Sequence, residues 1–317
     1  MTLVTGATGF VGRAVLERVA GDGACRLRAV ARRPVQAIRG VDVVNVGDLG
    51  PKTDWSTALS GVDAVVHAAA RVHVIRDKAV DPLAEFRRVN VSGTLNLAKQ
   101  AAAAGVQRFI FLSSIKVNGE QTSVGRSYTS DDTPAPAGPY GISKYEAELG
   151  LRELAQVTGM DVVIIRPVLV YGPGVKGNFR SMMRWLNMGI PLPLGSIHNA
   201  RSLVALENLV DLVATCLRHP AAANRTFMVS DGEDTSTTEL LQRVAAALGT
   251  SARLLPVPGW MLQTAASALG MGDVALRLCA SLQVDIGKTR EVLGWVPKVG
   301  LDEALQRTAQ NFMAGLQ

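Results

Sequence analysis

Residues 2–12 read Thr-Leu-Val-Thr-Gly-Ala-Thr-Gly-Phe-Val-Gly, an apolar run that leads into three glycines spaced three residues apart. The run predicts a buried strand, and the residues that follow predict a helix over 11–20. In such a turn Gly6 permits the sharp bend, Gly9 lets a pyrophosphate approach the backbone, and Gly12 lets helix and strand pack closely. The helix amino terminus presents free N–H groups to the phosphates. The stretch therefore predicts a dinucleotide site at the start of a βαβ unit.

Short β-branched runs alternate with helical patterns downstream of this turn, which is typical of a parallel sheet covered by helices on both faces. The expected strands are nearly all apolar, as burial on both faces requires. The strands are expected over residues 2–5, 26–31, 41–46, 64–67, 108–113, 162–166 and 226–229, and the helices over 11–20, 82–104 and 140–158. The sequence thus predicts an α/β fold with a Rossmann-type doubly wound parallel sheet.

The alternation weakens after residue 166, where a loop-rich passage rich in proline and glycine begins. Helical patterns follow over 179–188 and 201–218, and Ser236 opens a Ser-Thr-Thr-Glu capping box. The apolar stretch 259–271 is too short to cross a bilayer, which needs ~20 apolar residues, and it predicts a buried helix, with a helix that faces a membrane surface or a partner as the alternative.

These patterns predict two regions. Residues 1–166 form an NAD(P)-binding Rossmann domain, to which 201–230 return. A smaller, mostly helical substrate-binding region comprises residues 167–200 and 231–317.

Composition narrows the class of protein. Of 317 residues, 48% are hydrophobic and 19% charged, which indicates a globular protein with a well-filled interior. Cys25, Cys216 and Cys279 show no Cys-x-x-Cys spacing, so we expect three small buried side chains and no metal site. The net charge of +6 suits anionic ligands such as nucleotides, whereas dispersed arginines and 5% aromatic residues do not favour nucleic acid. The chain enters its first strand at once, so we expect a cytoplasmic protein without a signal peptide.

The end of the second strand bears on the choice of cofactor. A carboxylate there would bond the adenosine ribose of NAD, whereas arginine would pair with the additional phosphate of NADP. The chain has Arg32 and Arg33 at this point and no acidic residue before Asp42. The pattern favours NADP(H), with NAD as the alternative. Asp48 follows the third strand, where it could bond the adenine edge or cap its own loop.

Tyr140 and Lys144 lie one helical turn apart. A free tyrosine is a poor base because its pKa is near ~10. A lysine ammonium group on the same helix face could lower that pKa, so that the phenol exchanges a proton with an alcohol oxygen. None of the other three tyrosines has a lysine four residues on. With a bound dinucleotide, this pair predicts nicotinamide-dependent redox chemistry.

These motifs resemble those of the extended short-chain dehydrogenase/reductase family. The resemblance rests on the glycine turn, on Ser113-Ser114 at the end of the fifth strand and on Tyr140-x-x-x-Lys144. It continues through the segments 89–94, 166–173, 201–204 and 288–295. The combination is similar to nucleotide-sugar epimerases, dehydratases and 4-keto reductases, and it covers nearly the whole chain.

The resemblance implies a role for each matching residue. Tyr140 would be the acid/base, Lys144 would support it and bond the nicotinamide ribose, and Ser114 would bond the sugar oxygen. Substrate contacts are implied for Ser114, Lys116, Asn178 and Arg201. Cofactor contacts are expected at Gly6, Thr8, Gly9, Phe10, Val11, Gly12, Arg32, Arg33, Asp48, Leu49, Ala68, Ala69, Ala70, Asn90, Ser113, Tyr140, Lys144 and Pro167.

The same resemblance implies a UDP-sugar substrate and a homodimer formed by the helices over 82–104 and 140–158. Two positions depart from the family pattern, because many 4-epimerases have asparagine at Leu169 and tyrosine at Asn118. These departures imply a different sugar or a different pose of the sugar. The arginine pair and the missing carboxylate at the end of the second strand favour NADPH-dependent reduction, at C4, of a UDP-4-keto-hexose such as a 2-acetamido-2,6-dideoxy sugar of surface-polysaccharide biosynthesis. The alternatives are an NAD-dependent UDP-glucose or UDP-N-acetylglucosamine 4-epimerase and a non-catalytic NADP-binding regulator.

Overall fold

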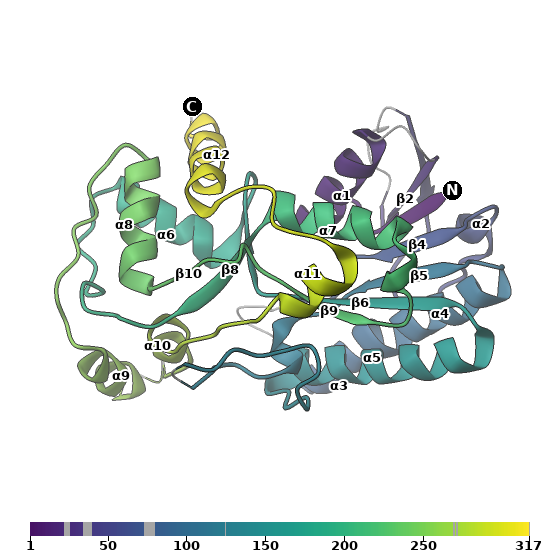
Figure 1. The fold of residues 1–317 in the computed structure, drawn as a ribbon, viewed down its shortest axis with the longest axis horizontal. Helices are drawn as coiled ribbons and strands as arrows, with labels where there is room; N and C mark the ends of the chain where they lie inside the picture. Colours follow the sequence, from purple (N-terminus) through teal and green to yellow (C-terminus); the bar gives the residue numbers. More distant parts are fainter. Residues whose placement is uncertain are drawn as a thin grey trace.

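The computed structural model describes residues 1–21, 26–33, 40–72, 80–123, 125–268, 270 and 272–316. Its main sheet has seven parallel strands in the order β3-β2-β1-β4-β5-β6-β9 (Figure 1). The strands are β1 Thr2–Thr5, β2 Leu27–Ala31, β3 Val41–Asn45, β4 Ala64–His67, β5 Arg108–Leu112, β6 Asp161–Pro167 and β9 Thr226–Val229. The predicted Rossmann-type sheet is confirmed. The strand order reverses between β1 and β4, and ligands of such sheets bind in the crevice beyond that point.

Two pairs of helices cover the faces of the sheet. Helices α1 (Phe10–Gly21) and α7 (Leu206–Arg218) pack on one face, and α4 (Thr94–Ala103) and α5 (Gly138–Thr158) pack on the other (Figure 1). Each face has its own buried apolar cluster. The shorter elements are α2 Ser56–Leu59, α3 Pro82–Phe86, η1 Arg87–Gly93, η2 Ile115–Val117, η3 Pro220–Ala222 and α11 Gly287–Leu293.

A second lobe surrounds a small sheet of three strands in the order β10-β8-β7. Its core consists of apolar side chains from these strands and from the helices beside them. The elements are β7 Leu169–Tyr171, β8 Arg201–Ala205, β10 Asp234–Thr235, α6 Gly177–Asn187, α8 Thr237–Ala247, α9 Gly259–Ala268, α10 Gly272–Cys279 and α12 Leu301–Ala314. The predicted cap of α8 is present, because the Ser236 hydroxyl accepts from the backbone N–H of Glu239.

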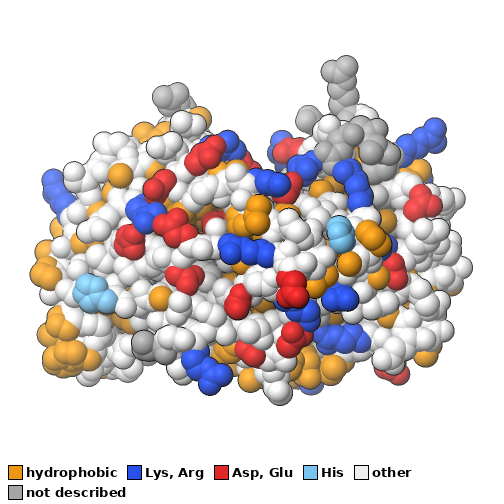
Figure 2. Space-filling model, in the orientation of Figure 1, with side chains coloured by type: hydrophobic (Ala, Val, Ile, Leu, Met, Phe, Trp, Pro, Cys, Tyr) orange, Lys and Arg blue, Asp and Glu red, His pale blue; other side chains and the backbone are white. Residues whose placement is uncertain are grey.

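Two sequence predictions about this lobe were wrong. Residues 201–218 were expected to be helical throughout, but residues 201–205 form β8, whose apolar side chains are buried and whose backbone pairs with β7. The apolar stretch at 259–271 was expected to be a buried helix. Helix α9 forms there, yet none of its ten residues is buried, and Trp260 is 68% exposed. Apolar side chains gather at this corner of the molecule, at the lower left of Figure 2.

Further observations concern the expectations about surface charge, membrane spans and cysteines. On the face shown in Figure 2, Lys and Arg side chains are interspersed with Asp and Glu side chains. Among the described residues, no helix combines the length and the apolar character that a membrane span needs. Cys216 is buried and Cys279 is partly buried, whereas Cys25 lies outside the described residues.

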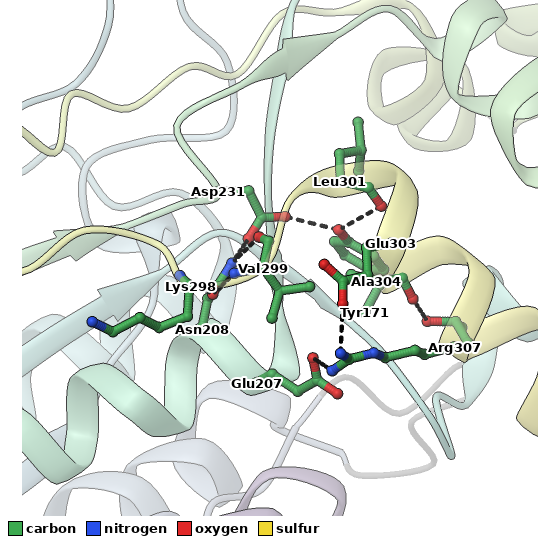
Figure 3. Close-up of polar contacts among 11 residues, drawn as sticks. Tyr171, Glu207, Asn208, Asp231, Lys298, Val299, Leu301, Glu303, Ala304 and Arg307 are labelled. Carbon is green, nitrogen blue, oxygen red and sulfur yellow. Dashed lines mark hydrogen bonds and ion pairs between the residues drawn. The ribbon is translucent and has the colours of Figure 1, made fainter.

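A buried polar network joins the carboxy-terminal segment to both lobes (Figure 3). The Asn208 amide nitrogen donates to Asp231 at 2.7 Å and to the Val299 carbonyl at 2.8 Å. The Asn208 amide oxygen accepts from the backbone N–H groups of Lys298 and Val299. The Tyr171 hydroxyl donates to Asp231 at 2.8 Å. Because Asn208 is fully buried, it satisfies backbone groups that water cannot reach.

Replacing Asn208 with alanine is expected to lower the free energy of unfolding by about 3 kcal/mol, because buried partners that lose their hydrogen bonds cost about 1–3 kcal/mol each. Urea denaturation followed by circular dichroism measures the change. The control is Glu207→Ala on the same helix turn, which removes the surface ion pair with Arg307 and should cost at most about 1 kcal/mol. Equal losses in the two variants would contradict the structural role of Asn208.

Candidate active site

The glycine turn leaves the start of α1 open to a ligand. Gly6 has a φ of +69°, and its carbonyl accepts from the N–H of Gly9 at 2.8 Å. A Cβ on Gly6 would lie 2.8 Å from the backbone nitrogen of Ala69, and a Cβ on Gly12 would lie 2.6 Å from the Gly6 carbonyl carbon. Thr8 and Gly9 are exposed to solvent. The turn fits a pyrophosphate bound to the N–H groups of a helix terminus.

The residues expected around the adenosine lie at the ends of β2 and β3. Arg32, Arg33 and Asp48 are all exposed, and the Arg32 guanidinium lies 3.9 Å from the Asp48 carboxylate. Leu49 is buried beside them. This edge offers two cations and one carboxylate. The other expected cofactor contacts, which are partly buried, are Phe10, Val11, Ala68, Ala69, Ala70 and Pro167.

Ser114, Tyr140 and Lys144 come together at the carboxyl end of β5. Ser114 follows that strand and hydrogen-bonds Tyr140 in the first turn of α5. The Lys144 ammonium group donates to the carbonyl of Leu112, the last residue of β5, at 2.7 Å. Helix α5 can approach because Gly141 has no side chain, since a Cβ there would lie 2.7 Å from the Lys116 carbonyl oxygen.

Burial governs the pKa values of the two α5 residues. It raises the pKa of Tyr140 to about 12, and the hydrogen bond with Ser114 opposes that rise. It lowers the pKa of Lys144 to about 7, and the charge of Glu148 opposes that fall. The sequence predicted that Lys144 lowers the pKa of Tyr140. In the structure, burial raises this pKa and the hydrogen bond with Ser114 lowers it. Burial therefore has a larger effect on the pKa of Tyr140 than the position of Lys144 one helical turn away.

Asn90 supports this helix from η1, a π-helical segment. Its side-chain oxygen accepts from the Arg71 backbone N–H at 2.8 Å, and its nitrogen donates to the Ser143 hydroxyl at 3.0 Å. Ser143 in turn donates to the Tyr140 carbonyl. Asn90 therefore braces the turn of α5 that bears Tyr140 and Lys144, and π-helical turns often occur at functional sites.

Behind the site lies a buried ionic cluster that the sequence analysis missed. Ser113, which was expected to be a neighbour of the cofactor, donates to Glu148 at 2.5 Å. Arg166 binds the same carboxylate through two nitrogens and donates to Asn118 at 2.9 Å. Asn118 thus contacts Arg166 inside the protein. The available signal was the position of Glu148, four residues after Lys144 on the same helix face.

The expected substrate residues are distributed over both lobes. Lys116 lies near Ser114 and pairs with Glu120 at 2.9 Å. Asn178 is exposed in the first turn of α6, in the second lobe. Arg201 donates to the carbonyls of Arg277 and Ala280, and burial lowers its pKa.

His67, at the end of β4, is fully buried between hydroxyl groups. One ring nitrogen bonds the Thr5 hydroxyl at 2.7 Å, and the other bonds the Thr94 hydroxyl at 2.9 Å. Burial lowers the pKa of His67 to about 3, so the ring is neutral at ordinary pH. It joins β1 and α4 beneath the site.

Comparison with known proteins places this geometry in a family. A family model described as NAD dependent epimerase/dehydratase family matches residues 2–230, well over half of the chain. The chain belongs to this family. A UDP-glucose 4-epimerase of Vibrio cholerae is 49% identical over 312 residues, which span 98% of this chain and 95% of that relative.

More distant members of the epimerase/dehydratase family extend the comparison. An N-acetyl-alpha-D-glucosaminyl-diphospho-ditrans,octacis-undecaprenol 4-epimerase of Escherichia coli O157:H7 is 28% identical over 97% of this chain and 94% of its own length. The crystal structure of UDP-glucose 4-epimerase with UDP-glucose from Thermotoga maritima matches with a TM-score of 0.80 and 23% identity, over 100% of this chain and 99% of that one, and shows the shared fold. This epimerase/dehydratase family member is therefore an enzyme of the nucleotide-sugar epimerase/dehydratase type.

Proposed function

We propose that the protein is a UDP-hexose 4-epimerase that retains a bound nicotinamide dinucleotide. The observation that carries this proposal is the meeting of Ser114, Tyr140 and Lys144 at the carboxyl edge of a sheet whose glycine turn opens the same crevice. The 49% identity to a protein named UDP-glucose 4-epimerase supports the reaction, and it favours epimerisation over the reduction expected from the sequence.

In this proposal each side chain has one task. When bound, the nicotinamide dinucleotide would supply a hydride acceptor and donor for C4 of the sugar. Tyr140 takes the proton of the C4 hydroxyl group and gives it back, while the Ser114 hydroxyl holds the same sugar oxygen. Lys144, whose ammonium group donates to the Leu112 carbonyl, would bind the ribose of the cofactor. Lys144 is buried, and its ammonium group lies 4.4 Å from the centre of the Phe111 ring.

We assign the substrate to the second lobe and to the loop after β5. Arg201 supplies a cation for the diphosphate, Asn178 supplies an amide, and Lys116 supplies a second cation from the catalytic side. Residues 1–166, with 206–230 returning to them, would bind the cofactor, and 167–205 with 231–317 would bind the sugar nucleotide. The pairing of β8 with β7 puts Arg201 at the start of a strand of the second lobe.

Two measurements test the reaction. The purified protein should release stoichiometric NAD(H) on denaturation and should interconvert UDP-glucose and UDP-galactose without added reductant. A protein that is isolated empty and that consumes NADPH with a UDP-4-keto-hexose would contradict the proposal.

That outcome would support a second candidate function, the NADPH-dependent 4-keto reductase. Arg32 and Arg33 at the end of β2 favour it, because a reductase exchanges its cofactor at every turnover and the arginine pair can bind the phosphate specific to NADP. In contrast, the epimerase/dehydratase family to which the chain belongs is described as NAD dependent. The arginine pair therefore calls for its own measurement of cofactor selectivity.

The double variant Arg32→Ala/Arg33→Ala is expected to weaken NADPH binding about tenfold or more, because a charge-assisted hydrogen bond is worth about 1.5–3 kcal/mol. NADH binding should be unchanged, since NADH lacks that phosphate. Calorimetric titration of both cofactors measures the ratio. Lys99→Ala, which removes an exposed cation on α4, is the control. Equal weakening of both cofactors would show that the arginines do not read the phosphate.

A further inference from the structure

The end of α6 and the start of α9 expose large apolar side chains. Trp185, Met188 and Ile190 lie at the end of α6 and in the turn that follows, and each is between 36% and 61% exposed. Trp260 and Met261, in the first turn of α9, are exposed as well. Single apolar side chains are normal on a protein surface, whereas a group of large ones marks an interaction site. The proposed reaction gives these side chains no task.

Both groups lie along one edge of the second lobe, which we name the α6–α9 edge. Residues 190–197 and 253–258 run side by side there, at the left of Figure 1. The Leu192 N–H donates to the Arg253 carbonyl at 2.9 Å, and the Leu255 N–H donates to the Leu192 carbonyl at 2.8 Å. Helix α9 begins directly after these paired segments. The exposed apolar side chains of the edge are Trp185, Met188, Ile190, Leu255, Trp260 and Met261.

Cations accompany this edge, and carboxylates are missing from the stretches of chain that form it. Residues 162–206 and 240–272 contain no Asp or Glu. The Arg253 guanidinium lies beside the turn after α6, because a Cβ on Gly189 would be 3.8 Å from its carbon. Three more cations recur every four residues along α6 and its cap, and therefore lie on one side of the helix. The exposed cations are Lys176, Arg180, Arg184 and Arg253.

The positive charge of the edge is not neutralised within the part of the chain that the structure describes. None of the four cations forms an ion pair with another described residue. Arg243 on α8 differs, because it is paired with Glu233, Glu239 and Asp302. The α6–α9 edge therefore combines exposed tryptophans with free positive charge.

This combination fits the surface of an anionic membrane. Tryptophan rings are enriched at the level of the lipid headgroups, and arginine and lysine are attracted to anionic lipids. Residues 254–272 contain no charged side chain, so α9 can enter the headgroup region without burying a charge. A second copy of this chain is a poorer occupant, because a symmetric contact would bring the same cations against each other.

We propose that the α6–α9 edge docks the protein on an anionic lipid surface. Trp260 and Met261 enter the headgroup region from α9, Trp185 and Met188 do so from the end of α6, and the cations beside them bind lipid phosphates. The proposal does not rest on the proposed reaction, because none of the apolar side chains of the edge is assigned to the crevice.

The test is sedimentation of the whole chain with vesicles of phosphatidylcholine that contain about a quarter of anionic phosphatidylglycerol. We expect the protein to sediment with these vesicles at low ionic strength and to bind pure phosphatidylcholine vesicles at least about tenfold more weakly. About 1 M NaCl should weaken the binding, because the screening length then falls to about 3 Å. A protein that stays in the supernatant with the anionic vesicles would overturn the proposal.

Trp260→Ala/Met261→Ala should lower the partition coefficient for the anionic vesicles about tenfold or more, because two large apolar side chains no longer leave water. Alanine favours the helix, so α9 should remain folded, which circular dichroism verifies. The matched control is Met313→Ala/Leu316→Ala, which removes two exposed apolar side chains near the carboxyl terminus and should leave the partition coefficient unchanged. Equal losses in the two variants would contradict the role of α9.

Arg184→Gln/Arg253→Gln should also lower the partition coefficient about tenfold or more, since cations near an anionic surface add to the attraction. The control removes the same number of charges elsewhere. Lys52→Gln/Lys99→Gln replaces two exposed cations beside the main sheet and should bind the vesicles more tightly than the arginine variant. If both charge variants bind alike, the cations of the edge have no special part and the proposal fails.

Tryptophan fluorescence distinguishes a lipid surface from an acidic protein. Lipids with brominated acyl chains should quench the emission of the wild type, and Trp260→Phe should lose part of that quenching, because Trp55 and Trp295 are buried. Binding to soluble polyglutamate without sedimentation or quenching would assign the edge to an acidic protein and would overturn the proposal. A wild type that binds the vesicles but converts no UDP-hexose would contradict only the proposed function.

Discussion

Tyr140→Phe is expected to lower kcat about 10³-fold, within the range of 10²–10⁴ that a positioned proton-transfer group contributes. The phenylalanine ring keeps the edge contact with Phe86, whose ring centre lies 6.0 Å from that of Tyr140, so the local packing should survive. Only the oxygen that bonds Ser114 is lost. Steady-state turnover of the UDP-hexose measures the rate, and fluorescence titration shows whether NAD(H) still binds with wild-type affinity.

The control is Tyr145→Phe on the same helix, which removes a hydroxyl from a half-buried tyrosine that is followed four residues later by Leu149 instead of lysine. Its kcat should match the wild type. Full activity in Tyr140→Phe would remove this phenol from the mechanism. Loss of turnover with retained biological function in the cell would instead favour a regulator that only binds the dinucleotide.

Gly12→Ala is expected to distort the glycine turn and to weaken cofactor binding. A methyl group there would overlap the carbonyl of Gly6, and neither backbone segment can move without opening the turn. Overpacking of this kind costs about 1–3 kcal/mol in the free energy of unfolding. Because the turn itself must shift, affinity for NAD(H) should fall by about 1.4 kcal/mol or more, which is tenfold. Chemical denaturation and cofactor titration measure the two effects.

Gly21→Ala provides the comparison within the same helix, because nothing lies within 4 Å of a Cβ at that position. Alanine is favoured over glycine in helices by about 1 kcal/mol, so this variant should be as stable as the wild type or more stable. If both substitutions had the same effect on cofactor affinity, close packing between Gly12 and Gly6 would not be what forms the site.

The sequence was sufficient for the parts of the fold that depend on local patterns. Strand β1, which leads into Gly6, and the apolar strand β5 are buried on both faces. A short apolar run of this kind indicates a buried strand of a parallel sheet. The cap at Ser236 was predictable for the same reason, because its hydrogen bond spans only three residues. Family resemblance added the expectations for Ser114 and Asn90, which local patterns do not assign.

Features decided by distant contacts were not predictable in this way. The segment 201–205 is a strand because β7 pairs with it, and no local signal separates it from the helix that follows. Exposure of Trp260 depends on what surrounds α9, and its composition alone suggested burial. The cluster around Glu148 joins α5, β5 and β6, so it becomes visible only when the sheet brings Ser113 and Arg166 to the same carboxylate.

The π-helical segment η1 has a consequence for how this protein can change over evolutionary time. A π turn holds one residue more than an α turn, so deleting one residue from Arg87–Gly93 would rotate one end of the helix against the other by about 100°. Asn90 would then swing away from Arg71 and Ser143. Deletion of a single codon in this stretch would therefore remove the support that Asn90 gives to the turn of α5 that bears Tyr140. Deletion of one residue from a surface loop would be tolerated.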